Sequence, residues 1–387
     1  MKRLLSGICL ISAALLAVTF AGDSSSARTK LTTLPQRSMV RIDLKNDRSI
    51  LVEEERTINL QKGVNQVEFA WANTYIQKAS IQFRTIKAPG TARVLNVNYP
   101  PGETALFWQV YSSKAGPGKF RISYLIGNIN KTISYEAIAD RNEKKLQLRT
   151  YFTMKNLSGE EFRNALVQID FGKDFRKTFR SGESKKMLAA RFNDVPVVKE
   201  YRFDPHIDSS NVRMNYLIDN SARNGMGRFP LPAGKVRIYQ EDSSGTEAFL
   251  GEDWGAYTPR EKKMSLYLGQ AKEVKVKKFI FKQKERYVEK PVKNITRVIK
   301  YRVENFKKEV VPLTIMAHPN GEWILSKIIL KEEKGERNKK KEKTIAHKNM
   351  IKTVKEDISN LKITFKVPHT KNMKYNLYVH LELRNRW

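Results

Sequence analysis

Short runs in which apolar and polar residues alternate follow one another along most of the chain, and clusters of turn residues separate them. Alternation with a period of two places the apolar side chains on one face of an extended strand. The runs recur about every ten residues, which is typical of antiparallel β-sandwiches and barrels. The pattern therefore predicts an all-β fold. The runs occupy residues 49–53, 56–60, 64–69, 81–85, 94–97, 106–111, 120–125, 132–138, 146–154, 165–171, 235–240, 247–250, 265–268, 275–281, 296–304, 311–316, 361–367 and 375–383.

Two pairs of runs have the features of β-hairpins. The polar residues 142–144 separate the runs 132–138 and 146–154, and residues 242–245 separate 235–240 from 247–250. The second turn ends in Gly245, which supplies the positive φ that a tight hairpin turn requires. We predict two successive antiparallel β-sandwich-like modules, residues 28–130 and 131–387.

Two stretches interrupt the alternation. Residues 172–200 are polar and basic, and we interpret them as a long connection. Residues 331–343 contain only Lys, Glu, Arg, Asn and Gly, so they offer nothing to a hydrophobic core. We predict a charged loop or a short helix inserted near residues 331–358.

The first 27 residues have the three parts of a secretory signal peptide. Lys2 and Arg3 form the positive start, residues 4–21 are mostly apolar, and small residues surround Ala21 and Ala27. The alternative is a retained membrane anchor, because the apolar stretch approaches the roughly 20 residues that span a bilayer. Its small and polar interruptions favour cleavage after Ala21 or Ala27. The mature chain would then be periplasmic or extracellular, with no transmembrane span.

The cysteine content limits the chemistry of the exported chain. Cys9 is the only cysteine, and it lies inside the apolar part of the leader rather than after it, where a lipidated cysteine belongs. Once the leader is removed, a disulfide, a thiolate metal site and a cysteine nucleophile are all excluded. A hydrophobic content of 40% suffices for an ordinary core and excludes wholesale disorder.

The net charge is the most unusual bulk property. It is +32 for the whole chain, and +30 if the leader is cleaved after Ala21. Such a field attracts polyanions. Outside the cytoplasm these are acidic glycans, anionic lipids and acidic proteins, and we expect no nucleic acid. A general bias toward lysine is the alternative, because the basic residues are spread along the whole chain.

Several motifs lie beyond residue 130. Runs 133–137 and 146–156 precede the turn Ser158-Gly159-Glu160, which Glu161-Phe162 follows. The most distinctive motif is Phe229-Pro230-Leu231-Pro232-Ala233-Gly234, which leads into the run 235–239 and is closed by residues 249–253. In these motifs the chain resembles the family called domain of unknown function 4139.

The resemblance covers about residues 131–387 and departs from the family pattern at two places. Glu161-Phe162 stands where the family usually has Asp-Trp. The basic segment 331–357 is longer than the family pattern. The resemblance implies an exported β-sandwich architecture, in which the turn formed by Pro230, Leu231, Pro232, Ala233 and Gly234 has a structural role. It implies no reaction.

Asp204, His206 and Asp208 occupy alternate positions around Pro205. On an extended strand all three side chains would face one way, a spacing that can ligate a divalent metal. The alternative is a polar loop, which we favour because no second histidine cluster lies nearby in sequence. We therefore predict no metal site.

No catalytic signature is present. Glu252 and Asp253 are adjacent, so on a strand they would point to opposite faces, whereas a glycosidase needs two carboxyl groups about 5–10 Å apart across a cleft. The sequence has no nucleophile elbow, no phosphate-binding loop and no dinucleotide-binding turn. We predict no catalytic residues and no cofactor.

The remaining candidate for function is the lysine-rich segment. Lys339, Lys340, Lys341 and Lys343 on a flexible tether can dock on a polyanion, although a solvated insertion kept soluble by its charge is the simpler interpretation. We predict a non-enzymatic cell-envelope protein that binds or scaffolds, with an anionic envelope glycan, lipid or acidic protein as its partner. The alternatives are an envelope hydrolase whose carboxylates converge only in the fold, and a subunit of an extracytoplasmic assembly.

Overall fold

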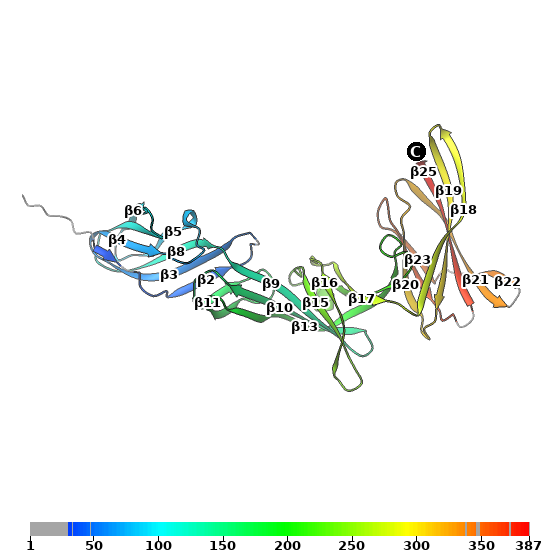
Figure 1. Ribbon diagram of the computed structural model, residues 1–387, viewed down its shortest axis with the longest axis horizontal. Helices are drawn as coiled ribbons and strands as arrows, with labels where there is room; N and C mark the ends of the chain where they lie inside the picture. Colours follow the sequence, from blue (N-terminus) through cyan, green and yellow to red (C-terminus); the bar gives the residue numbers. More distant parts are fainter. Residues whose placement is uncertain are drawn as a thin grey trace, which may run out of the picture. The chain divides into compact units, whose positions relative to one another are not determined.

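The computed structural model describes residues 30–32, 34–46, 48–336, 339–345, 349–370 and 373–386. Within these ranges the regular structure is β-strand, apart from two 3₁₀ turns, η1 (Lys78–Ser80) and η2 (Ala222–Asn224). The strands form four sheets (Figure 1). The predicted all-β fold is confirmed. The predicted leader, residues 1–27, lies outside the described residues.

The chain divides into two compact units, and their limits differ from the predicted modules. The first unit has the described residues up to Arg37, together with Arg56–Ala72 and Phe83–Arg121; the second has Ser38–Glu55, Asn73–Gln82 and the chain from Ile122 onward. The predicted boundary at residue 130 falls inside a strand, β9. β3 and β8 each contribute residues to both units, so two of the limits between the units fall inside strands.

Aromatic side chains form the core of the first unit. Phe83 stacks on Phe120 with ring centroids 4.9 Å apart and lies 4.7 Å from Trp108, which in turn lies 5.9 Å from Phe69. Trp108 and Phe120 are fully enclosed. Interdigitated rings of this kind stabilise a small unit because each buries a large apolar area. The sheet of this unit has the order β1 (Lys30–Thr32), β4 (Gly63–Ala70), β7 (Ala105–Ser112), β6 (Ala92–Asn98).

A six-stranded sheet contains the long strands β3 and β8. Val52 and Ile58 of β3 and Ile122 of β8 are completely buried and alternate with more exposed neighbours, as the sequence pattern predicts. The strand order is β12 (Phe175–Phe179), β11 (Phe162–Gln168), β2 (Met39–Asp43), β3 (Ile50–Leu60), β8 (Gly116–Ile126), β5 (Gln82–Lys87).

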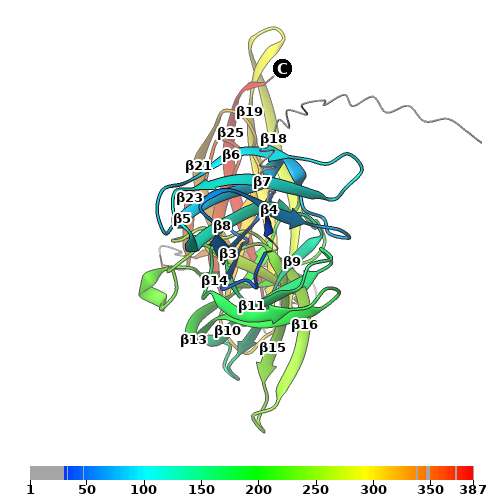
Figure 2. The ribbon, with the colours of Figure 1, turned by 90° about the vertical axis from the view of Figure 1, so that its left-hand side faces the viewer.

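A ten-stranded sheet runs through the second unit (Figure 2). Its path is β16 (Glu247–Gly255), β15 (Gly234–Glu241), β9 (Ile129–Ala139), β10 (Lys145–Asn156), β13 (Ser184–Phe203), β20 (Val311–Ala317), β24 (Leu361–Val367), β23 (Ile351–Lys355). Off this path, β14 (Arg213–Asp219) pairs with β13 and with β17 (Lys263–Gln270). Both predicted hairpins, β9–β10 and β15–β16, are confirmed, and Gly245 has φ +78°.

The five-stranded sheet packs one face into a shared core. Its order is β18 (Val274–Glu289), β19 (Val292–Asn305), β25 (Met373–Arg386), β21 (Trp323–Glu336), β22 (Lys339–Ile345). Tyr301 and Leu377 from this sheet join Leu313 and Phe365 from β20 and β24 in one buried cluster. Side chains from two sheets that meet in one core make this part of the chain a β-sandwich.

The structure corrects three predictions about local structure. Residues 172–200, interpreted as a connection, contain β12 and the 20-residue strand β13. Within residues 331–358, predicted as a charged loop or a short helix, the described residues include the end of β21, the strand β22 paired with it, and the strand β23. The sheets are also not purely antiparallel, since β1–β4, β2–β11, β9–β15 and β13–β20 pair in parallel. Backbone pairing orders these basic stretches, with the adjacent strand for β12, β22 and β23 and also with the distant β20 for β13.

Candidate functional site

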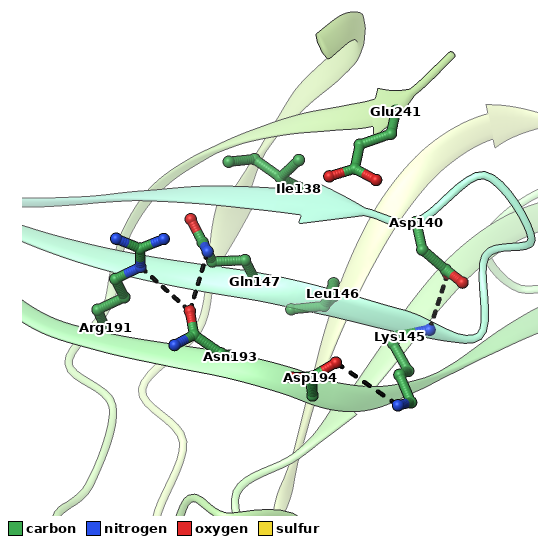
Figure 3. Close-up of a pocket in the computed structure, with 9 residues that line it drawn as sticks. All are labelled: Ile138, Asp140, Lys145, Leu146, Gln147, Arg191, Asn193, Asp194 and Glu241. Carbon is green, nitrogen blue, oxygen red and sulfur yellow. Dashed lines mark hydrogen bonds and ion pairs between the residues drawn. The ribbon is translucent and has the colours of Figure 1, made fainter. Parts of the chain in front are cut away.

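A pocket of about 490 Å³ opens where β9 and β10 meet β13 and β15 (Figure 3). The pocket lies on neighbouring strands of the ten-stranded sheet, and its position is set by the β9–β10 turn and by the end of β15. Three carboxylates and two cations are on its wall, so it is a polar site rather than an apolar one. Its lining residues are Ile138, Asp140, Lys145, Leu146, Gln147, Arg191, Asn193, Asp194 and Glu241.

Two of the three carboxylates in this pocket are engaged with the protein. Asp140 accepts a hydrogen bond of 2.9 Å from the backbone N–H of Lys145, and Asp194 lies 3.5 Å from the Lys145 ammonium. Glu241 has no side-chain partner among the described residues. In Figure 3 its carboxylate lies beside Ile138, whereas the Asp140 carboxylate is directed at the Lys145 backbone. General acid–base cleavage requires two carboxyl groups aimed at one bond, and the pocket does not arrange them so.

A second polar cluster lies on the face of the five-stranded sheet that is turned away from the shared core. Glu333 of β21 and Glu342 of β22 are cross-strand partners. The Asn376 amide of β25 donates to both carboxylates, at 2.7 Å and 2.9 Å. Asn376 is fully buried, and its Oδ1 has no hydrogen-bond partner in the described part of the chain. We call these residues, with the cations around them, the Glu333–Glu342 cluster.

Cations and a phenol neutralise this cluster. Glu342 lies 3.0 Å from the Lys300 ammonium and 3.2 Å from that of Lys331, and it accepts a hydrogen bond of 2.9 Å from the Tyr378 hydroxyl. Arg302 lies 3.4 Å from Glu333. Desolvation raises the pKa of Glu342, but the hydrogen bonds from Lys300, Tyr378 and Lys331 outweigh it, so the pKa is lower than usual. A carboxylate held ionised is unsuited to act as a general acid, and the cluster therefore holds the β21–β22 hairpin to the sheet.

Residues 204–208, whose alternate side chains would face one way on an extended strand, do not form a strand. β13 ends at Phe203, and the backbone N–H groups of Ile207 and Asp208 both bond back to the Asp204 carbonyl in a turn. Asp208 accepts hydrogen bonds from the backbone of Ser210, away from Asp204. In the part of the chain that the structure describes, no three His, Cys, Asp or Glu side chains are grouped to hold a metal ion.

Asp204 has a different partner, which the sequence pattern missed. His318, after β20, donates from Nε2 to the buried Asp204 carboxylate at 2.8 Å, and its other ring nitrogen lies 2.6 Å from Asn360 Oδ1. His206 stacks on His318 with ring centroids 3.7 Å apart. Burial opposes ionisation of Asp204, but hydrogen bonds from Arg202 and His318 leave its pKa below the usual range. Both ring nitrogens of His318 are engaged, so the pair lacks a free nitrogen for proton transfer to a substrate.

The strands β18 and β19 form a long hairpin, which we call the basic hairpin, residues 274–305. It contains eleven Lys or Arg and three Glu, a net charge of +8. Every residue of β18 from Lys277 onward is exposed. Lys293 pairs with Glu285 at 2.8 Å, whereas Lys282 and Lys284 have no ion-pair partner in the described ranges. Among the described residues, unpaired lysines are therefore exposed on β18, an edge strand of this sheet.

The predicted polyanion-binding lysines are on a strand rather than a flexible tether. Lys343 is exposed on β22, opposite Glu332 of β21. The backbones of Lys339, Lys340 and Lys341 belong to the same strand, but their side chains lie outside the described part of the structure. The basic hairpin, which the sequence pattern did not single out, is the alternative location for such binding. Its signal in the sequence is the presence of six Lys or Arg and three aromatic residues within residues 275–287.

The turn formed by Pro230, Leu231, Pro232, Ala233 and Gly234 is anchored inside the protein. Leu231 is fully buried and exchanges two backbone hydrogen bonds, of 2.9 Å and 2.8 Å, with Thr258. The Tyr135 hydroxyl donates to the Pro232 carbonyl at 2.6 Å. A Cβ at Gly234 would lie 2.5 Å from the Ile133 carbonyl oxygen, so only glycine fits beside β9. These contacts are those of a structural element.

Comparisons with known proteins give no family for the chain. No family model matches it, and neither does any curated protein. The resemblance to domain of unknown function 4139 therefore stays a prediction from the motifs. Within the described residues, no helix has the length and apolar character needed to cross a membrane.

Proposed function

We propose that this chain is a non-enzymatic, exported protein of the cell envelope that binds an anionic envelope component. The observation that supports this most is the contrast between the carboxylate clusters and the basic hairpin. Glu333, Glu342 and Asp204 are neutralised by protein cations or hydrogen bonds. The edge strand β18 instead keeps a net charge of +4, from six Lys or Arg and two Glu, and its residues are exposed from Lys277 onward. An unneutralised, exposed charge of one sign attracts and orients a partner of the opposite sign.

The resemblance to domain of unknown function 4139 and the predicted leader support the same cellular location. Both point to export, and a mature chain without cysteine needs no oxidative folding step. A lineage-wide bias toward lysine would raise the net charge without concentrating it. The concentration in residues 274–305, where about a third of the residues are Lys or Arg, favours a functional use of the charge.

The proposal is tested by retention of the full chain on an immobilised acidic polysaccharide and on anionic vesicles. Surface charges are screened within about 8 Å at physiological ionic strength and within about 3 Å at 1 M. We expect elution to move to much higher salt than for a neutral protein of equal size, and retention to be lost near 1 M. No retention on either support at low salt, or retention unchanged by salt, would contradict the proposal.

A subunit of a larger extracytoplasmic assembly is the second candidate function. The edge strand β16 favours it, because Phe249 and Trp254 are 60% and 61% exposed there. Exposed apolar residues on an unpaired strand edge offer a surface for pairing with another chain. Sedimentation of the chain with envelope extract, compared with a Trp254→Ser, Phe249→Ser variant, distinguishes this candidate: an assembly held by β16 dissociates in the variant.

A further inference from the structure

The basic hairpin exposes apolar side chains as well as cations. Ile280 and Phe281 are each 61% exposed, Tyr287 is 56% and Val288 is 63%. Figures 1 and 2 both show the turn of the β18–β19 ribbon beyond β25, whose last residue, Arg386, lies opposite Lys293. Tyr287 and Val288 lie beside this turn, and Ile280 and Phe281 lie in the middle of β18. Exposed large apolar side chains that share one strand commonly mark an interaction site.

Both faces of the hairpin carry these apolar residues. Ile280 is opposite Ile299, which faces the shared core, whereas Phe281 occupies a bulge and makes an edge-to-face contact with Tyr378 on the other face, with ring centroids 5.1 Å apart. A β-bulge adds one residue to a strand and redirects the side chains around it. The hairpin therefore exposes large apolar side chains on both of its faces.

Cations are interleaved with the apolar residues along the same stretch. Lys282, Lys284 and Arg286 alternate with other residues between Phe281 and Tyr287, and they have no ion-pair partner among the described residues. Nearer the core, Lys278 is partly desolvated and close to Arg297, and both effects lower its pKa. An anion bound beside Lys278 would relieve this repulsion. The stretch thus presents anion-binding and apolar groups to the same partner.

We propose that the basic hairpin docks on the surface of an anionic lipid bilayer, with the side chains of residues 280, 281, 287 and 288 entering the headgroup region and the lysines binding lipid phosphates. This inference rests on the proposed function and names its partner. A bilayer offers negative charge and an apolar layer within one surface, which both sets of residues match. A soluble acidic polysaccharide would leave the apolar residues in water. A second copy of the hairpin would bring two charges of +8 together.

The β15–β16 hairpin provides a matched comparison in the same unit. Its Phe249 and Trp254 are exposed to the same degree as Phe281, but residues 234–255 contain two Lys or Arg and five Asp or Glu, a net charge of −3. Exposed aromatic residues are thus present on two edge strands, and only one of them carries the positive charge that anionic lipid requires. The control for the loss of positive charge uses two other exposed lysines, Lys177 on β12 and Lys173 just before it.

The test is co-sedimentation of the full chain with vesicles of phosphatidylcholine containing phosphatidylglycerol. Each Lys near an anionic surface contributes about a five-fold gain in affinity, so Lys282→Glu with Lys284→Glu is expected to weaken binding by at least about 25-fold. Phe281→Ser with Val288→Ser is expected to weaken it by at least about ten-fold, because partial burial of two apolar side chains is lost. Lys173→Glu with Lys177→Glu, and Phe249→Ser with Trp254→Ser, are expected to stay within two-fold of the wild type.

A second measurement reports insertion without depending on the folding of the serine variants. Cys9 is the only cysteine, so in a Cys9→Ser chain Val288→Cys carries a single environment-sensitive fluorophore, and Phe249→Cys is the control. We expect the emission of the label at residue 288 to rise and shift to the blue on adding vesicles, and that of the label at residue 249 to stay unchanged. Equal response of the two labels would overturn the inference.

The outcomes separate this inference from the proposed function. Retention on acidic polysaccharide without vesicle binding would overturn the lipid partner and leave the proposed function standing. Vesicle binding that the hairpin variants do not weaken would also overturn the lipid partner alone. So would hairpin variants that change the oligomeric state of the protein but leave vesicle binding unchanged. Failure of the wild type to bind either polyanion would overturn both.

Discussion

Glu342 is the residue on which we expect the β21–β22 hairpin to depend most. Its carboxylate side chain is 23% exposed, although it lies on an edge strand, and it interacts with Lys300, Lys331, Asn376 and Tyr378 at distances of 2.9 to 3.2 Å. The substitution Glu342→Gln keeps the shape and one acceptor oxygen but removes the charge. It leaves two ammonium groups without their counter-charge.

The expected loss follows from these contacts. Removing one partner of a fully buried ion pair costs about 3–5 kcal/mol, and a hydrogen bond to a charged group contributes about 1.5–3 kcal/mol. Water reaches part of the Glu342 side chain, and glutamine retains some of the hydrogen bonds, so we expect a loss of about 2 kcal/mol. If this loss is confined to the β21–β22 hairpin, it raises the equilibrium constant for local opening of the hairpin about 30-fold.

Hydrogen exchange of the backbone amides, followed by mass spectrometry at pH 7, measures that opening. We expect peptides from β21 and β22 to exchange about 30-fold faster in the variant, and peptides from β9 and β10 to be unchanged. The matched control is Glu332→Gln, which removes the charge of the residue next to Glu333 on β21. The Glu332 side chain has no hydrogen bond or ion pair in the described ranges. Equal exchange in the Glu342 and Glu332 variants would refute the reasoning.

Three further expectations follow from the buried contacts. The pKa of Glu342 in the folded protein lies below its unfolded value of 4.5. The stabilisation that its carboxylate gives the hairpin is therefore present above pH 4.5 and is lost as the pH falls through the folded pKa. The difference in exchange between wild type and Glu342→Gln should shrink at lower pH. Asp204→Asn should lower the stability at pH 7 by about 1 kcal/mol, seen as a lower urea midpoint that converges with the wild type in acid; equal midpoints at pH 7 would count against the His318 contact. Gly234→Ala should cost about 2 kcal/mol, because its Cβ would lie 2.5 Å from the Ile133 carbonyl; an unchanged melting temperature would show that β9 and β15 can separate there.

The alternation of apolar and polar residues predicted most of the strands because it reports local geometry. β10 shows this well: Leu146, Leu148, Phe152 and Met154 are buried and alternate with partly exposed residues, as the sequence pattern requires. The same reasoning failed for β13 and β22, whose sequences are basic. β13 pairs with β10 and with the more distant β20, whereas β22 pairs with the adjacent β21, and a hydrophobic pattern holds no information about such backbone pairing.

The candidate sites were predictable to a smaller extent. Asp204 was singled out, but its partner His318 lies 114 residues further along the chain, and only the fold brings the two together. Glu333 and Glu342 are likewise joined by strand pairing in a segment whose composition predicts solvated loop. Charge is the one functional signal that the sequence carried directly. The structure concentrates it on the basic hairpin, where the lysines lie among exposed aromatic residues.

Fractionation of cells that produce the full chain, with the predicted leader, tests most directly the claim that the protein is exported and binds an anionic envelope component. We expect the chain in the envelope fraction, with a new N-terminus after Ala21 or Ala27, and we expect 1 M salt to release most of it, since screening at that ionic strength confines charge interactions to about 3 Å. An intact N-terminus in the cytoplasmic fraction, or an envelope-bound chain that 1 M salt does not release, would contradict an exported protein held by an anionic partner.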